Sequence, residues 1–82
     1  MTTVEIEYCV PCGFLETAMQ TQRHLLEEFG RDLTGVELQP GHGGVFEVRV
    51  GEETIWDKDV HGGDVDHELV ADAVGETLAV DD

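Results

Sequence analysis

The residues of this 82-residue chain best suited to chemistry are its only two cysteines, Cys9 and Cys12. They form a Cys-x-x-Cys motif, a spacing typical of a redox-active pair that cycles between a dithiol and a disulfide. In a reducing compartment, a lone pair of this kind is more often catalytic or metal-binding than structural. The competing interpretation is a pair of inert cysteines in the core.

The order of the two thiols in the motif predicts their roles. Cys9 is expected to be the nucleophile and the more exposed thiol, at the end of a strand and next to the amides that begin a helix. Those amides and the helix dipole favour a thiolate. Pro11 fits the first turn of that helix, because its missing N–H costs nothing there. Cys12, inside the same turn, is expected to be the resolving thiol.

Two hydrophobic periods predict the elements around the motif. Residues Thr3–Tyr8 alternate polar and apolar side chains, which indicates a strand with one face open to solvent. Residues Phe14–Phe29 repeat apolar side chains at helical spacing, and Gly30 follows as a helix stop. The inner stripe of this helix is expected to consist of Leu15, Ala18, Gln22, Leu25, Leu26 and Phe29, with Met19 at its border.

The rest of the chain predicts three more strands and a second helix. Strands are expected at Val36–Leu38, Val45–Val50 and Thr54–Trp56, with a tight hairpin at Gly51. Apolar residues at helical spacing then predict a helix capped by Asp64, with the apolar positions Val65, Leu69, Ala73, Val74 and Leu78.

These elements predict one α/β domain over residues 1–82, a two-layer sandwich with the order β-α-β-β-β-α. A parallel strand–helix–strand crossover is right-handed, and one face of the first strand is polar. Both helices are therefore expected on the same face of a four-stranded mixed sheet. The cysteines then lie at the C-terminal edge of the parallel pair, where open α/β sheets bind ligands.

A glycine-rich segment, residues 40–44, is expected to cross the end of the first strand. This follows if the second strand pairs with one side of the first strand and the third strand with the other. Gly43 and Gly44 would let the backbone pass close to Cys9. His42 could then donate to a sulfur; the alternative is a solvated loop histidine. His24 and His67 are expected on the surface, and His61 is ambiguous between a turn and the rim of the site.

Several pieces of the chain occur together in a characteristic order: Glu7-Tyr8-Cys9-Val10-Pro11-Cys12, Pro40 to Val48, Ile55-Trp56, Lys58 and His61-Gly62-Gly63. In these pieces the chain resembles the selenoprotein W-like (Rdx) family. The resemblance implies a thioredoxin-like fold and a thiol-based redox role. It also implies that the selenocysteine found in some members corresponds to Cys12. One departure is Asp64-Val65, where the family usually has Phe-Pro after a Gly-Gly pair, so no partner is carried over. The expected surroundings of the cysteines are Tyr8, Pro11, Gly13, His42, Gly43 and Gly44.

The charge balance is strongly acidic, with 19 Asp and Glu against four Lys and Arg and a formal net charge of −15. This charge argues against binding to nucleic acid or to an anionic membrane surface. Neither a leader peptide nor a long apolar run is expected, so a cytoplasmic location is predicted. The protein is also expected to be a monomer. The acidity itself predicts a halophilic host, because at about 1 M salt the Debye length is roughly 3 Å and the carboxylates are screened.

The leading functional prediction is a thiol–disulfide redox protein without a cofactor, whose partner is a protein or small-molecule thiol or disulfide. Turnover as an oxidoreductase is left open, because a redox-sensing adaptor that binds a partner is the alternative. A third alternative is a metal-binding protein that uses Cys9, Cys12, His42 and His61. A structural zinc site needs four ligands in tetrahedral geometry, and one Cys-x-x-Cys supplies two of them.

The net charge of −15 predicts that folding depends on salt. Raising KCl from low to molar concentration should raise the thermal unfolding midpoint, because the repulsion among the 19 acidic residues is screened. Unfolding followed by circular dichroism across this salt range checks the effect. A flat or falling midpoint would remove the halophilic interpretation.

Overall fold

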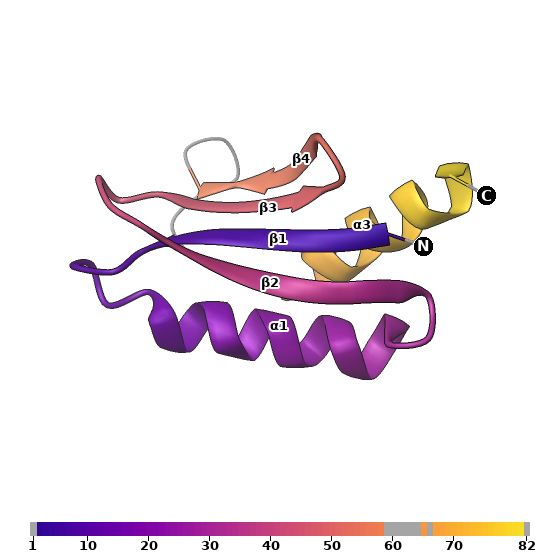
Figure 1. Cartoon of the computed structure of the whole chain (residues 1–82), viewed down its shortest axis with the longest axis horizontal. Helices are drawn as coiled ribbons and strands as arrows, with labels where there is room; N and C mark the ends of the chain where they lie inside the picture. The colour runs from indigo at the N-terminus through magenta and orange to yellow at the C-terminus, as the bar shows by residue number, and fades with distance from the viewer. Residues whose placement is uncertain (1, 59–64, 66, 82) are drawn as a thin grey trace.

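Four strands and two helices make up the described part of the chain, residues 2–58, 65 and 67–81 of a computed structural model. In chain order they are β1 (Thr2–Cys9), α1 (Leu15–Phe29), β2 (Leu33–Gly41), β3 (Phe46–Val50), β4 (Glu53–Asp57) and α3 (His67–Asp81). The strands form one sheet in the order β2-β1-β3-β4 (Figure 1). β1 and β2 run parallel, and the other pairs are antiparallel. The predicted mixed sheet and element order are confirmed.

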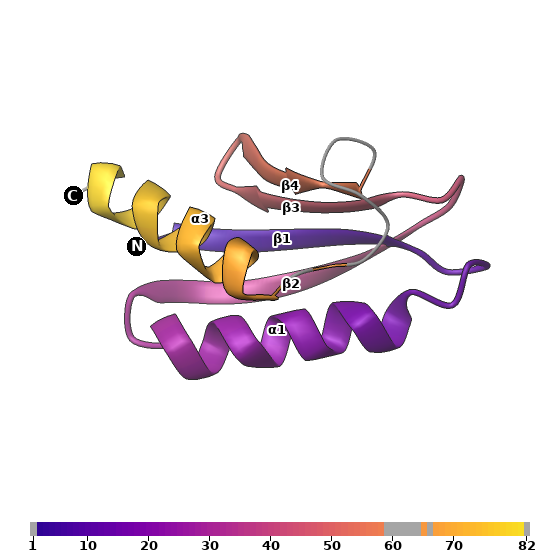
Figure 2. The same cartoon turned by 180° about the vertical axis from the view of Figure 1, so that it is seen from behind.

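Both helices cover one face of the sheet, as predicted. α1 packs against β1 and β2, α3 packs against β3 and β4, and the two helices contact each other. Figure 1 shows α3 behind the sheet, and Figure 2, from the opposite side, shows it in front. The core between the two layers is apolar and includes Val4, Ile6, Leu25, Phe46, Val48, Trp56, Val70 and Val74.

The alternation of β1 separates the two faces of the sheet. Val4, Ile6 and Tyr8 are buried beneath the helices, whereas Glu5 and Glu7 are half-buried on the other face. Successive side chains of a strand point to opposite faces, so this pattern leaves a polar, open face. The prediction of one open face from residues Thr3–Tyr8 is therefore confirmed.

The second strand is longer than predicted. The prediction was a short strand at Val36–Leu38, but β2 runs from Leu33 to Gly41 and pairs with β1 along its whole length. It includes Pro40, which the prediction had assigned to the turn. β2 is an edge strand, and a proline is tolerated at an edge because its missing N–H removes no ladder hydrogen bond on the free side.

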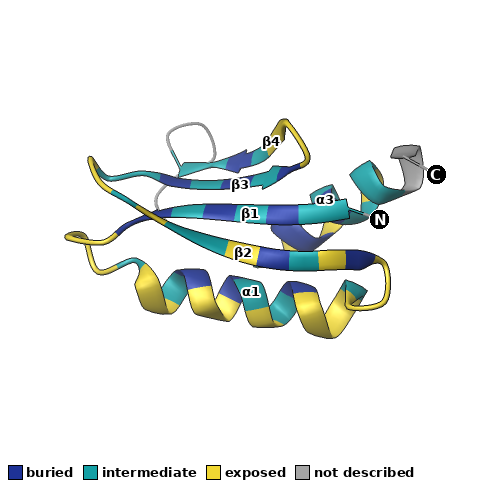
Figure 3. Cartoon of the chain, in the orientation of Figure 1, coloured by how far each residue is buried: buried dark blue, intermediate teal, exposed yellow. Residues whose placement is uncertain are grey.

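The inner stripe of α1 differs from the predicted stripe at three residues, Leu15, Leu26 and Thr21. Leu15 and Leu26 are exposed, and the buried residues are Ala18, Thr21 and Leu25. Figure 3 shows buried and exposed stretches alternating along α1. Thr21 is tolerated in the core because its hydroxyl donates to the Thr17 carbonyl oxygen at 2.8 Å. Likewise Leu69 of α3, predicted to be inside, is exposed. The predicted cap of that helix, Asp64, lies outside the described residues.

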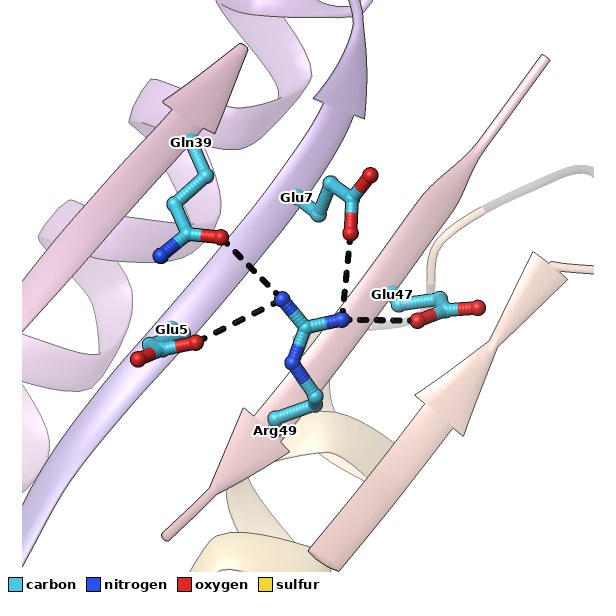
Figure 4. A network of polar contacts seen from close by, with 5 residues as sticks. All are labelled: Glu5, Glu7, Gln39, Glu47 and Arg49. Atoms are coloured by element: carbon cyan, nitrogen blue, oxygen red, sulfur yellow. Dashed lines mark hydrogen bonds and ion pairs between the residues drawn. The ribbon is translucent and has the colours of Figure 1, made fainter. Parts of the chain in front are cut away.

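On the open face of the sheet, one arginine, Arg49, forms hydrogen bonds to four neighbouring side chains. Nη1 of Arg49 donates to Glu7 Oε1 at 3.2 Å and to Glu47 Oε2 at 2.8 Å. Nη2 donates to Glu5 Oε2 at 3.4 Å and to Gln39 Oε1 at 3.2 Å (Figure 4). We call these five residues, drawn from β1, β2 and β3, the Arg49 cluster.

Arg49 offsets a like-charge contact in the sheet. Glu7 and Glu47 lie directly opposite one another on β1 and β3, an arrangement that destabilises an antiparallel pair. Partial burial lowers the pKa of Arg49, but its hydrogen bonds to Glu7 and Glu5 and the charges of Glu7 and Glu47 outweigh this and raise the pKa. The guanidinium therefore stays charged and continues to neutralise the acidic pair.

Replacing Arg49 by methionine should lower the free energy of unfolding by about 1–3 kcal/mol at low salt, because three carboxylates lose a shared, partly buried cation. The loss should shrink in molar KCl as the carboxylates become screened. Chemical denaturation at both salt concentrations measures the difference. Arg23→Met is the matched control, because the Arg23–Glu27 pair is 82% and 67% exposed and should contribute less than about 1 kcal/mol. Equal losses in the two variants would contradict this role of Arg49.

Candidate redox site

Cys9 and Cys12 lie at the C-terminal end of β1 at disulfide distance, and their Cα atoms are 5.3 Å apart. This Cα separation falls within the range that a disulfide spans without strain on the backbone. Two backbone hydrogen bonds hold the turn between them and α1: Gly13 N–H donates to the Val10 carbonyl, and Phe14 N–H donates to the Cys9 carbonyl. Gly13 has φ +77°, a conformation that side chains rarely adopt.

The exposure of the two sulfur-bearing residues is the reverse of the prediction. Cys9 is 1% exposed, whereas Cys12 is an exposed residue. Pro11 and Cys12 also lie in the turn before α1, not in its first helical turn as predicted, because the helix begins only at Leu15. The extra turn moves Cys12 outward into solvent and leaves Cys9 at the end of the strand.

The glycine-rich segment crosses the end of β1, as predicted. Cys9 N–H donates to the Val45 carbonyl at 2.8 Å, and Val10 N–H donates to the Gly41 carbonyl at 3.0 Å. Gly43 and Gly44 have φ of +77° and +80°, so both need the freedom of glycine. Two backbone hydrogen bonds therefore link the end of β1, which carries the buried Cys9, to residues 41–45.

The backbone of Gly41 lies close to two side chains, a role that was not predicted from the sequence. A Cβ at this position would lie 2.9 Å from Glu7 Oε2 and 2.9 Å from Val45 Cγ1. Gly41 is also the register partner of Cys9 on β2. Its position in a run of glycines hid this role, because the sequence alone does not show which glycine lies against another side chain.

Aromatic packing fixes the turn on the helix side. Phe14, which follows the motif, packs edge-on against Phe46 of β3, with ring centroids 6.1 Å apart. Tyr8 is buried and is the register partner of Phe46. A hollow of about 220 Å³ lies beyond these rings, and neither cysteine lines it. The residues that line it are Phe14, Thr17, Gln20, Phe46, Lys58, Val65 and His67.

The histidines are placed differently from the predictions. His42 is exposed, and within the described residues it forms no hydrogen bond to either cysteine. His24 and His67, predicted on the surface, are half-buried and stack between the helices with ring centroids 5.8 Å apart. His61 lies outside the described residues. In residues 2–58, 65 and 67–81 no three His, Cys, Asp or Glu side chains are grouped as metal ligands.

The family of the chain follows from comparison with known proteins. A family model described as the Rdx family matches residues 3–76, nearly the whole domain. The chain belongs to the Rdx family. It is 31% identical over 62 residues to the mouse (Mus musculus) protein "Migration and invasion enhancer 1". That match covers 73% of this chain and 50% of the mouse protein, so this Rdx domain spans about half the length of that relative.

Two solved structures share the fold of this Rdx domain. A crystal structure of a Bordetella parapertussis protein has a TM-score of 0.89 at 34% identity, covering 93% of this chain and 96% of that one. A selenoprotein W-related protein from Vibrio cholerae has a TM-score of 0.90 at 26% identity, covering 94% and 96%. The predicted thioredoxin-like fold and the resemblance to the selenoprotein W-like family are thereby confirmed.

Oxidation of the cysteines should change the backbone amide resonances of residues 41–45 as well as those of residues 8–14. The two segments share the hydrogen bonds from Cys9 and Val10, so a change of geometry at the sulfurs reaches both. Amide spectra of the dithiol and disulfide forms test this. Gly51, at the opposite end of the sheet, is the internal control and should not shift.

If residues 41–45 do not shift while residues 8–14 do, the crossing segment does not respond to the redox state.

Proposed function

We propose that this protein is a thiol–disulfide redox protein in which Cys9 and Cys12 cycle between the dithiol and the disulfide. The observation that carries the proposal is the pairing of one exposed and one buried cysteine at disulfide distance. An inert structural pair has no need of an exposed member. An exposed thiol can meet a substrate, and a buried thiol beside it can complete the exchange.

The exposure of the residues assigns the order of attack. The Cys12 thiolate attacks a sulfur of the substrate disulfide, a mixed disulfide forms, and the first substrate thiolate leaves. Cys9 then attacks the Cys12 sulfur, the bond between Cys12 and the substrate breaks, and the second substrate thiolate leaves. The substrate disulfide is reduced to two thiols, and the Cys9–Cys12 pair is oxidised. Our sequence-based order, with Cys9 attacking first, rested on an exposure that the structure reverses.

The substrate that fits this site is a protein or small-molecule disulfide. Neither cysteine lines the hollow of about 220 Å³, and Cys12 is an exposed residue, so we propose that it meets its substrate on the surface. No helix in the described residues is long and apolar enough to span a membrane. We further propose that the protein works as a monomer in a salt-rich cytoplasm, for which its net charge of −15 is the support.

In the reduced protein, limiting iodoacetamide should modify Cys12 before Cys9, because Cys9 is 1% exposed. Peptide mapping by mass spectrometry gives the order. Cys12→Ser should abolish reaction with Ellman's reagent, whereas Cys9→Ser should react once and stop at a stable mixed disulfide. Faster modification of Cys9 would reverse the proposed order.

Turnover separates this function from that of a redox-sensing adaptor. With a small dithiol as reductant, the wild-type protein should accelerate the reduction of a disulfide substrate over many cycles, and both serine variants should fail. A pair that closes once and is not reduced again would contradict the redox function and favour the adaptor.

A further inference from the structure

Burial of Cys9 creates a proton problem for the proposed exchange. When Cys9 attacks the mixed disulfide at Cys12, its thiol must lose a proton, because the thiolate is the nucleophile. Cys9 is 1% exposed, so bulk water has almost no contact with it. A group of the protein beside Cys9 is needed to receive that proton.

Glu7 is placed to be that group. It lies two residues before Cys9 on β1, and residues two apart on a strand lie about 7 Å apart on the same face. Its Oε2 lies 2.9 Å from the point where a Cβ of Gly41 would be. Gly41 is the cross-strand partner of Cys9, so this oxygen extends along the sheet toward the cysteine.

The two oxygens of the Glu7 carboxylate are used differently. Oε1 accepts from Nη1 of Arg49 at 3.2 Å, and Oε2 accepts no hydrogen bond from the described residues. Figure 4 shows one oxygen turned toward Arg49 and the other turned away from it. Arg49 thus orients the carboxylate, and the missing side chain of Gly41 leaves room for the second oxygen. The charged and polar groups that face Glu7 from β1, β2 and β3 are Glu5, Gln39, Glu47 and Arg49.

We propose that Glu7 accepts the proton of the Cys9 thiol when Cys9 attacks Cys12, a role that rests on the proposed redox function. The Cys9 S–H bond breaks, and its proton passes to Glu7 Oε2. The new Cys9–Cys12 bond forms with the electron pair of the Cys9 sulfur, and the Cys12–substrate bond breaks. The departing substrate thiolate takes the proton from Glu7, so the carboxylate is restored and no other reactant is needed.

The Glu7 carboxylate could change the rate of attack by Cys9 in two opposite directions, so the direction of the rate change on its removal tests the proposal. A carboxylate that acts only as a nearby negative charge disfavours the Cys9 thiolate, so its removal would accelerate the attack by Cys9. A carboxylate that receives the proton accelerates the attack, so its removal slows it. General-base catalysis typically contributes about 10²–10⁴-fold.

Ellman's reagent separates the two chemical steps in the whole protein. The first thionitrobenzoate is released when Cys12 attacks the reagent, and the second when Cys9 closes the disulfide. Both are followed by stopped-flow absorbance across a range of pH. In Glu7→Gln the first phase should keep its rate, and the second phase should slow about 10²-fold near neutral pH. The deficit should shrink at high pH, where hydroxide deprotonates Cys9.

Two controls isolate the position of Glu7. Glu5→Gln removes the same charge from the same strand and the same Arg49 cluster, two residues farther from Cys9. Glu37→Gln removes an exposed charge from the neighbouring strand β2. Neither control should slow the second phase. A second phase that is unchanged or faster in Glu7→Gln, or equally slow in Glu5→Gln, would overturn the proposal.

A second pair of variants keeps the carboxylate and moves it. In Gly41→Ala the new methyl group meets Glu7 Oε2 and Val45 Cγ1, both at 2.9 Å, and displaces the carboxylate, whereas Gly35→Ala on the same strand meets nothing within 4 Å. Amide spectra of Gly41→Ala check that the hydrogen bond from Cys9 N–H to the Val45 carbonyl is kept. The second phase should slow in Gly41→Ala relative to Gly35→Ala. Equal rates in these two variants would also count against Glu7. If the wild type releases no second thionitrobenzoate, the redox function itself fails, a result distinct from all of these.

Discussion

The return of the chain across the end of β1 is the constraint on which the rest of the site depends. Because β2 and β3 flank β1, the segment that joins them must pass over the strand end that carries Cys9. The backbone there is hydrogen-bonded to the crossing segment: Cys9 N–H donates to the Val45 carbonyl, and Val10 N–H donates to the Gly41 carbonyl. This crossing accounts for the burial of Cys9, and it needs glycines where the chain takes positive φ.

The second constraint is electrostatic and lies on the open face. A chain with 19 acidic and four basic residues can neutralise few of its carboxylates. It places Arg49 where two glutamates face each other across β1 and β3. That placement fixes the orientation of Glu7, which lies on the strand that ends at Cys9. Arg49 thus both stabilises the open face and orients the glutamate that precedes Cys9 on β1.

The sequence predicted the fold well, because its periods are strong where one face is buried. The alternation of Thr3–Tyr8 and the helical repeat of Phe14–Phe29 predicted β1 and α1 almost to the residue. It failed where periodicity is ambiguous. Leu15 and Leu26 lie on an apolar stripe of α1 beside the buried one. A leucine is a more usual core residue than a threonine, so the burial of Thr21 was missed; its hydroxyl donates to the Thr17 carbonyl within the helix.

At the candidate site the sequence predicted the crossing of the β1 end correctly but not the exposure of the two cysteines. The Cys-x-x-Cys motif indicated Cys9 and Cys12. The expected strand order predicted that residues 40–44 cross the strand end that carries Cys9. The exposure was wrong, because the start of α1 depends on a turn through Gly13 at positive φ that spacing does not reveal. Glu7 and Arg49 were missed because their contact depends on the strand register. Parity along each strand places both on the open face, and only the pairing of β1 with β3 brings them together.

The exposed surface around Cys12 also limits how such a small domain can choose a substrate. Neither cysteine lines the hollow on the helix side, so among the described residues this hollow does not enclose the disulfide substrate that we propose. Cys12 is an exposed residue of the turn that also contains Pro11 and Val10, which is 50% exposed. Val10 N–H donates to the carbonyl of Gly41 in the crossing segment, and the exposed His42 follows Gly41 in the chain. These residues lie on loops whose backbones are tied together by hydrogen bonds. In the redox function that we propose, selection of a substrate therefore falls to this preformed loop surface. Its strength would depend on how well the substrate fits against that surface.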